Sequence, residues 1–184
     1  MSTPTRWTDD HFVAGDIALD FANTVFRRTP ELGADLLDSG RSLTGWFGHA
    51  GLLPPTDDPP AATEGALPAA RRLRDRLWVV VDSQREGGEV PADALTGLLE
   101  QARSGVVTVT ADGTVRPRSL AGALAAVALA GIRLVLTPPP RPVRSCDRCG
   151  WYFLDTSRGR RRRWCSMKTC GNQAKAARFR DSHS

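Results

Sequence analysis

Cys146-Asp-Arg-Cys149, followed after fifteen residues by Cys165-Ser-Met-Lys-Thr-Cys170, is the stretch that decides how the end of this 184-residue chain folds. The sequence contains no other cysteine. Two close pairs separated by a short insert suit a tetrahedral four-thiolate zinc site, because each tight turn supplies two sulfurs and the metal closes the loop between them. We therefore predict one structural Zn²⁺ bound by Cys146, Cys149, Cys165 and Cys170. Four unligated cysteines and a redox-active dithiol are the alternatives.

The same region carries a dense positive charge. Residues 141–184 contain ten Arg and two Lys against three Asp, a formal charge of +9, whereas residues 1–140 sum to −4. A zinc ion with four thiolates leaves the C-terminal module at roughly +7. Such concentration favours a polyanionic partner over the alternative, a basic surface that serves solubility alone. The residues that we expect to contact nucleic acid are Arg158, Arg160, Arg161, Arg162, Arg163, Lys168, Gln173, Lys175 and Arg178.

Local signals predict a treble-clef-like zinc finger around the cysteines. The first pair forms a knuckle, and Trp151-Tyr-Phe-Leu154 forms a strand whose aromatic side chains cover one side of the site. Residues 156–159 turn the chain, and residues 160–164 return antiparallel to that strand. The second pair then arrives at the start of a helix over residues 171–181. Four sulfur ligands leave no open coordination position, so the zinc is expected to be structural and not catalytic.

The N-terminal region is predicted to be mainly helical with one small β-hairpin, which makes the whole chain α+β. Leu19 and Phe26 would share the apolar face of a first helix, and Ser42 would cap a second that runs to about Gly51. A loop is expected at Pro54–Pro60. Further elements are helices over 68–85, 91–102 and 119–136, the last capped by Ser119, and a hairpin over 106–118 that turns at Asp112-Gly113.

We expect two domains, 8–137 and 143–182, joined by a stiff proline-rich connector at 138–142. The first residues lack an apolar signal segment, and the apolar stretch 120–136 indicates a buried helix and not a bilayer span. A cytoplasmic protein with no membrane association is therefore expected, and a reducing compartment favours metal over disulfides. No nucleophile–base pair, phosphate loop or histidine cluster is present, so the protein is not expected to be an enzyme.

Several motifs resemble a known family. Phe153-Leu-Asp-Thr-Ser-Arg158, Arg163-Trp-Cys-Ser-Met167 and Cys170-Gly-Asn-Gln-Ala-Lys175 resemble the CGNR zinc finger, a C-terminal module of bacterial transcription regulators. Gly15-Asp-Ile-Ala-Leu-Asp-Phe-Ala-Asn-Thr24 resembles the opening of the ABATE domain that accompanies it. The resemblance covers almost the whole chain and implies a ligand-sensing N-terminal domain, a DNA-binding finger and a bacterial source. The CGNR motif ends in Arg, where this chain has Gln173 and so lacks one charge.

Asp20, Asn23, Thr24 and Arg27 place polar groups at i, i+3, i+4 and i+7 of the first helix and form the predicted ligand site. The alternative is that Asp20 and Asn23 bind nearby loop backbone. The sequence thus predicts a zinc-finger DNA-binding regulator that senses an unknown small molecule and acts as a homodimer, with its signal carried through the connector. The alternative function is a zinc-stabilised protein-interaction or RNA-binding module without sequence-specific DNA recognition.

Overall fold

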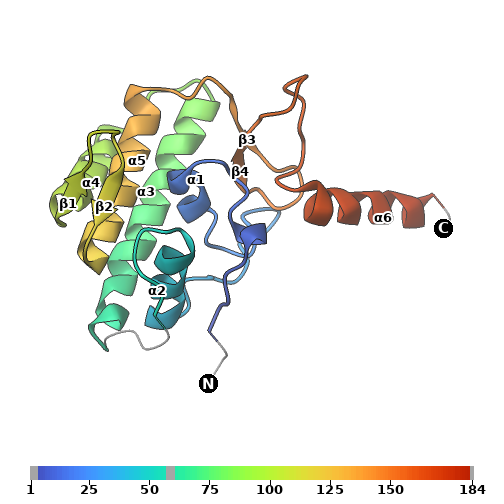
Figure 1. Ribbon diagram of the computed structural model, residues 1–184. Coiled ribbons are helices and arrows are strands. Elements are labelled where there is room, and N and C mark those ends of the chain that lie inside the picture. Colours follow the sequence, from blue (N-terminus) through green and yellow to red (C-terminus); the bar gives the residue numbers. More distant parts are fainter. Residues whose placement is uncertain (1–3, 57–60, 183–184) are drawn as a thin grey trace.

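The computed structural model describes residues 4–56 and 61–182, and these form a helical body from which a small zinc-finger module projects (Figure 1). The body contains the helices α1 (Ile17–Ala22), α2 (Gly40–His49), α3 (Leu67–Arg85), α4 (Ala92–Arg103) and α5 (Leu120–Leu136), the short 3₁₀ helices η1 (Asp9–His11) and η2 (Ala61–Ala66), and the strands β1 (Val107–Val109) and β2 (Val115–Pro117). The module contains β3 (Val143–Ser145), β4 (Tyr152–Leu154), the π-helical turn η3 (Met167–Gly171) and α6 (Asn172–Asp181). The predicted α+β class is confirmed.

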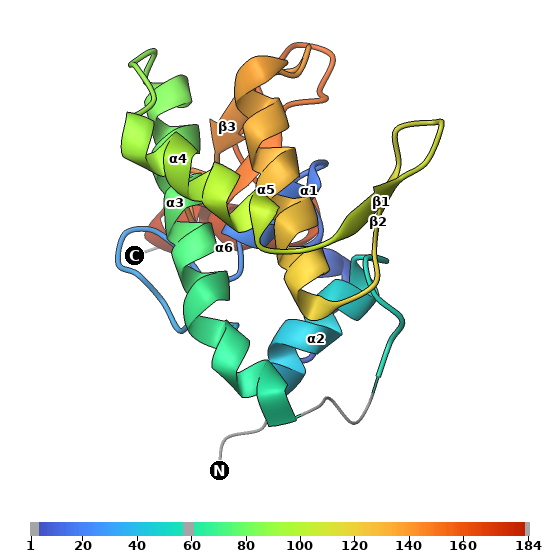
Figure 2. The same ribbon diagram turned by 90° about the vertical axis from the view of Figure 1, so that its left-hand side faces the viewer.

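Helices α3, α4 and α5 pack against one another (Figure 2), and they share the core of the body with α1 and α2. The predicted stripe on α3 is confirmed, since Leu73, Leu77 and Val80 are fully buried. Close packing of α5 against α3 depends on Gly131, where an added Cβ would lie 2.5 Å from Leu77 Cδ2. Ser119 caps α5 as predicted, accepting a hydrogen bond from the backbone N–H of Gly122 at 3.1 Å. Within the described part of the chain, none of the helices is both long and apolar enough to cross a bilayer.

The hairpin of the body also matches its prediction. Strands β1 and β2 pair antiparallel with Val109 opposite Val115, and Gly113 adopts a φ of +81° in the turn between them. The backbone N–H of Gly113 donates to the carbonyl of Thr110 at 2.9 Å. A β-turn of this kind needs a residue that tolerates positive φ, which explains why Asp112-Gly113 marks it.

Two helix boundaries differ from the predictions. Helix α1 ends at Ala22 and is capped by Asn23, so Phe26 lies outside it and its side chain is 65% exposed; the predicted apolar face that included Phe26 is wrong. Helix α2 is capped by Ser39, whose Oγ accepts from Ser42 N–H while Ser42 Oγ accepts from Ser39 N–H. This reciprocal pair makes Ser42 the third residue of the helix and not its cap. Of the predicted loop over 54–60, residues 57–60 lie outside the described residues.

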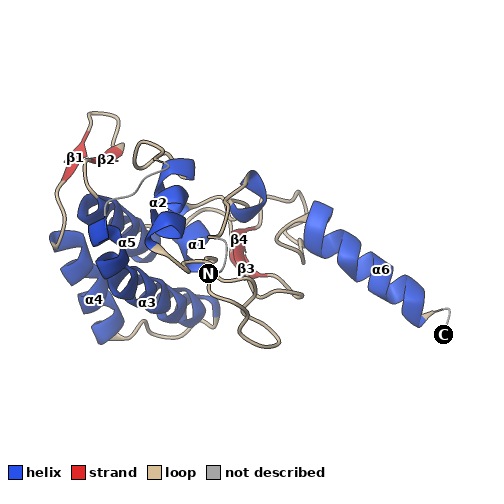
Figure 3. Ribbon diagram, turned by 90° about the horizontal axis from the view of Figure 1, so that it is seen from below, coloured by secondary structure: helices blue, strands red, loops and turns tan. Residues whose placement is uncertain are grey.

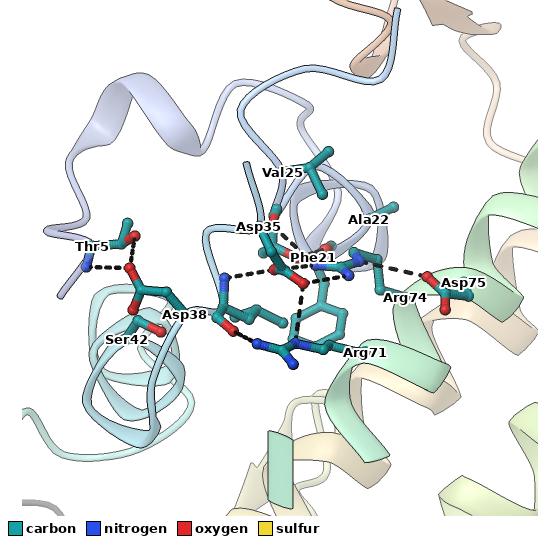
Figure 4. A network of polar contacts seen from close by, with 12 residues as sticks. Thr5, Phe21, Ala22, Val25, Asp35, Asp38, Ser42, Arg71, Arg74 and Asp75 are labelled. Carbon is teal, nitrogen blue, oxygen red and sulfur yellow. Dashed lines mark hydrogen bonds and ion pairs between the residues drawn. The ribbon is translucent and has the colours of Figure 1, made fainter. Parts of the chain in front are cut away.

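An ion-pair network centred on the buried Arg74 fastens the segment after α1 to α3 (Figure 4). Arg74, only 5% exposed, donates to both carboxylate oxygens of Asp35 at 2.7 and 2.9 Å, and Arg71 contacts the same carboxylate at 3.0 Å. Burial alone would raise the pKa of Asp35, but the hydrogen bonds and charge of Arg74 outweigh it and lower that pKa. The network therefore holds residues 24–37 in place, and this segment carries several of the contacts to the zinc finger.

The finger hairpin is not the one predicted from the sequence. Strand β4 pairs with β3, with Ser145 opposite Tyr152, and residues 160–164 form no strand in the described structure. The knuckle Cys146–Cys149 is thus the turn of the hairpin, because the Cys146 N–H donates to the Trp151 carbonyl at 2.8 Å and continues the ladder. The predicted order of knuckle and then hairpin is therefore wrong, whereas the helix still follows the second cysteine pair.

Candidate zinc centre and its junction with the body

The four cysteines converge on one buried point. Their Sγ atoms all lie within 4.8 Å of one another, with Cys149 and Cys165 3.5 Å apart and Cys165 and Cys170 3.6 Å apart. A tetrahedron with Zn–S bonds of about 2.3 Å has edges of about 3.8 Å. None of the four forms a disulfide. The donor set and its spacing therefore fit one structural Zn²⁺.

The short distances between the four sulfur atoms favour the binding of a doubly charged cation at this site. Hydrogen bonds from the thiols of Cys149 and Cys165 lower the pKa of Cys146, because they stabilise its thiolate. The same contact raises the pKa of Cys165, which must give up its proton beside a sulfur that is already negative. Sulfurs this close therefore oppose deprotonation of all four thiols, whereas Zn²⁺ would bind them as four thiolates, offset half of their charge and release their protons.

Asp155 shapes the loop that connects the two cysteine pairs. Its side chain is fully buried, and its carboxylate accepts from the N–H of Ser157 at 3.0 Å, the N–H of Arg162 at 3.0 Å and Arg144 Nε at 2.9 Å. Burial by itself would raise the pKa of Asp155, but these hydrogen bonds and the Arg144 charge hold it below its ordinary range. The loop over 156–163 is therefore organised by a carboxylate and not by strand pairing.

Strand β4 belongs to the body and to the finger at once. Because side chains alternate along a strand, Tyr152 and Leu154 pack with the core of the body, while Trp151 and Phe153 pack with the four cysteines. The expectation that all the aromatic residues of this strand cover the zinc site is wrong for Tyr152. Its ring is fully buried and lies 4.3 Å from the guanidinium carbon of Arg28.

Asn23 joins the body to this strand. Its Nδ2 donates to the carbonyl of Tyr152 at 2.9 Å, and its Oδ1 accepts from the N–H of Tyr152 at 2.8 Å. Two further bonds reinforce the contact: Trp151 Nε1 donates to the Val25 carbonyl at 2.8 Å, and the Arg28 N–H donates to the Cys149 carbonyl at 2.6 Å. The backbone of a zinc ligand is therefore bonded directly to the body.

The other predicted ligand-binding residues have separate positions. Asp20 accepts from the Ala14 N–H at 2.9 Å, and Thr24 Oγ1 donates to the Phe21 carbonyl at 2.8 Å. Arg27 lies 3.6 Å from the carboxylate of Glu31. It also lines a cavity beside the zinc centre, whereas Asp20, Asn23 and Thr24 do not line that cavity. Asp20 and Asn23 thus bind backbone, as the alternative interpretation held, and a ligand role for the four together stays a prediction.

The stability of the wild-type protein is expected to fall as the pH rises, and the change Asp20→Asn is expected to abolish the part of this fall that Asp20 causes. Burial raises the pKa of Asp20 to about 7, against the opposing hydrogen bond from Ala14. When the pKa of a carboxyl group is higher in the folded state than in the unfolded state, its contribution to the stability of the folded protein is complete below the unfolded-state pKa. That contribution is lost as the pH rises through the folded-state pKa. Between about pH 5 and about pH 8 the loss is on the order of 2–3 kcal/mol.

Urea unfolding of both proteins across this pH range measures the effect. The zinc thiolates titrate in each, so the difference between wild type and Asp20→Asn isolates Asp20. A difference that stays constant with pH would contradict the prediction.

The predicted nucleic-acid residues divide into two groups. Lys168 contacts Asp10 at 3.3 Å, and Arg163 contacts Asp147 at 2.6 Å. Arg162 lies 4.5 Å over the Phe153 ring and donates to the carbonyls of Trp164 and Cys165, so its guanidinium serves the finger itself. In the part of the chain that the structure describes, no carboxylate lies within ion-pair distance of the remaining exposed cations, Arg158, Arg160, Arg161, Lys175 and Arg178.

Gln173, the departure from the CGNR motif, has a partner of its own. Its Oε1 accepts from Arg148 Nε at 2.8 Å. An arginine at this position would face Arg148 with like charge, so glutamine suits the arginine that lies opposite in this chain. Neighbouring Asn172 donates to the Lys168 carbonyl at 3.1 Å and binds backbone.

Sequence reasoning missed four residues that shape the site: Tyr152, Asp155, Arg144 and Arg148. The period-two alternation in 151–154 could have separated Tyr152 from its neighbours. The partners of the other three depend on contacts across the finger, and no local pattern identifies them.

Comparison with known families agrees with this architecture. A family model for the CGNR zinc finger matches residues 143–183, and the ABATE model, described as "Putative stress-induced transcription regulator", matches residues 15–138. A search of curated proteins returned no match. Since the ABATE match spans well over half of the chain and the finger follows it directly, the chain belongs to the ABATE family and carries a C-terminal CGNR zinc finger.

Proposed function

We propose that this protein is a DNA-binding transcription regulator, in which the zinc finger contacts DNA and the helical body senses a small molecule. The observation that carries the proposal is the position of α6. This helix extends away from the body and ends far from it (Figure 3). None of its ten residues is buried.

Helix α6 has the size and charge of a DNA-contacting element. A helix of ten residues is roughly 15 Å long, and the major groove, about 12 Å wide, admits an α-helix. Lys175 and Arg178 lie three residues apart and share one exposed ridge. Ala174 and Ala177 face the knuckle across a cleft of about 340 Å³ that Arg148, Arg163 and Arg178 also line. The Arg148–Gln173 hydrogen bond links the first turn of the helix to the knuckle, and the ridge is exposed to a phosphate backbone.

The loop before the second cysteine pair adds to this cationic surface. Arg158, Arg160 and Arg161 are exposed on it, and Asp155 holds its backbone in shape. Arg160 adopts a φ of 49°, a conformation that local contacts must enforce in a non-glycine residue. The zinc site and Asp155 therefore present three arginines in a defined arrangement, which supports phosphate contacts at low entropic cost.

The body is placed to influence the finger because the two share β4. A change at Asn23 or Arg28 reaches the zinc ligand Cys149 through hydrogen bonds, a shorter route than the predicted connector over 138–142. In this proposal the protein has no catalytic role. A single finger buries limited surface on DNA, so we infer that a homodimer binds paired sites.

The double change Lys175→Ala, Arg178→Ala is expected to weaken DNA binding without preference for sequence. If four cations of the zinc-loaded finger contact phosphates, log affinity falls with log salt at a slope of about −3.6. Removing two of these cations should change this slope by about 1.8, to about −1.8. Fluorescence anisotropy of labelled genomic fragments across a salt series measures both slopes.

The matched control is Arg72→Ala, Arg103→Ala, which removes two exposed arginines from the body. Equal weakening by both double variants would refute the assignment to α6. Selection and sequencing of fragments that survive high salt completes the test, since enrichment of a common site supports a regulator. Equal affinity for RNA, heparin and duplex DNA would instead favour the alternative interaction module.

A further inference from the structure

A cavity of about 370 Å³ lies at the junction of the body and the finger. Phe26, Arg27 and Leu36 line it from the body, and Arg148, Trp151 and Gln173 line it from the finger. Three of the zinc-binding cysteines, Cys149, Cys165 and Cys170, reach the same wall. Its volume is near the lower end of the range for ligand pockets, which suits a small occupant.

Much of the wall is apolar and aromatic. Trp151 and Leu36 belong to the packing around the cysteines, and Phe26 lies at the cavity with 65% of its side chain exposed. The segment that carries Phe26 is held in place, because the Phe26 N–H donates to the Ala34 carbonyl at 2.9 Å. An exposed phenyl ring that lines the same cavity as a tryptophan provides contact area for a flat apolar molecule.

Two guanidinium groups at the cavity lack a close carboxylate partner. Arg27 has a buried Nε without a hydrogen-bond partner among the described residues, and its nearest carboxylate, on the exposed Glu31, is 3.6 Å away. Arg148 donates to the neutral Gln173, and the acid at the cavity, Asp10, is already in contact with Lys168 at 3.3 Å. An anionic group would complete this arrangement. The zinc thiolates are negative, so they disfavour an occupant with several anionic groups.

We propose that this cavity binds a small, flat, mainly apolar molecule that carries one carboxylate, with the acid at Arg27 and Arg148 and the apolar part against Phe26 and Trp151. The regulatory meaning of this site rests on the proposed function, whereas ligand binding itself does not. Because the walls come from both parts of the chain, the occupant holds the finger against the body. Ligand binding therefore favours the state in which the finger is held against the body, and detachment of the finger from the body weakens ligand binding.

A matched pair of probes tests the chemistry of the site: 2-naphthoate and its neutral amide, 2-naphthamide. The chain has five tryptophans, so the indole N–H signals in an NMR titration of the zinc-loaded protein report the location of binding. We expect 2-naphthoate to shift the Trp151 signal saturably and to leave that of the core residue Trp46 in place. The amide should bind at least about fivefold more weakly, because it lacks the charge that the arginines recognise.

The variant Arg27→Gln should weaken 2-naphthoate about five- to tenfold and leave the amide unchanged. Arg103→Gln, an exposed arginine on α4 away from the cavity, is the control and should have no effect. Unchanged zinc content verifies that each variant keeps its finger. Equal affinity for acid and amide, equal effects of the two variants, or no Trp151 shift at about 5 mM probe would overturn the proposal.

Zinc release tests whether the occupant joins the two walls. With 2-naphthoate at ten times its dissociation constant, the release of zinc to a chromogenic chelator should slow about elevenfold if the junction between body and finger must open before the zinc leaves. An unchanged rate would refute the bridging role. Both measurements use the protein without DNA, so failure of DNA binding leaves this result intact, and failure of probe binding leaves the DNA-binding proposal intact.

Discussion

Replacing Cys170 by alanine is expected to abolish zinc binding and to unfold the finger over residues 143–182. The four sulfurs lie within 4.8 Å of one another, a spacing that brings thiolate charges together unless a metal binds them. Apparent zinc-binding free energies of structural sites are about 10–16 kcal/mol, far more than a module of this size gains from its own core. The loss of one thiolate therefore exceeds what the remaining contacts can offset.

The effect of this change should reach the body as well. Tyr152 contributes a fully buried ring to the body core, and it sits on a strand whose turn is the zinc knuckle. Displacing a large buried aromatic side chain costs about 3–5 kcal/mol. We expect Cys170→Ala to retain the helices of the body, to lose α6, and to unfold at a markedly lower urea concentration than the wild type.

Cys170→His is the matched control, since histidine also ligates zinc and Cys170 is 8% exposed at the edge of the site. It should retain zinc with reduced affinity, and reloading the chelated wild type should restore the original midpoint. Elemental analysis and urea unfolding measure both effects. Stoichiometric zinc in Cys170→Ala with an unchanged midpoint would refute a structural four-thiolate site.

Asn23→Ala should weaken the attachment of the finger to the body while leaving the zinc ligands intact. The change removes the hydrogen bonds of 2.9 and 2.8 Å to Tyr152 and leaves a buried N–H and a buried carbonyl without partners. Each unsatisfied buried group costs about 1–3 kcal/mol, so the two together should lower the free energy of unfolding by about 2–6 kcal/mol. Zinc release to a chelator should accelerate, because the Cys149 side of the knuckle loses its support.

Asn172→Ala is the control for loss of an asparagine. This residue is exposed and makes one hydrogen bond to the Lys168 carbonyl, so the expected change is within about 0.5 kcal/mol. Trp151→Phe removes a second junction bond, Nε1 to the Val25 carbonyl, and should couple to Asn23→Ala in a double-mutant cycle. Additive effects of the two, or an Asn23→Ala protein as stable as the wild type, would show that the junction does not unite the two parts.

The sequence by itself determined the features that depend on residues close together in the chain. Cysteine spacing identified the zinc ligands, Ser119 identified the start of α5, and Asp112-Gly113 identified a turn, because each signal acts over a few residues. The charge of the C-terminal region was equally readable. Helical periodicity located α3 correctly but extended the first helix to Phe26, since an apolar residue in register does not show where a helix ends.

Only the tertiary structure decided which partners these residues find. Residues 151–154 suit a strand with either neighbour, and the hydrogen bonds of Asp155 to residues 157 and 162 prevent the downstream pairing that the sequence suggested. Asn23 and Tyr152 are 129 residues apart, and an asparagine amide can bind a ligand or a peptide group equally well. The junction and its cavity arise from such long-range contacts, for which the chain carries no local pattern.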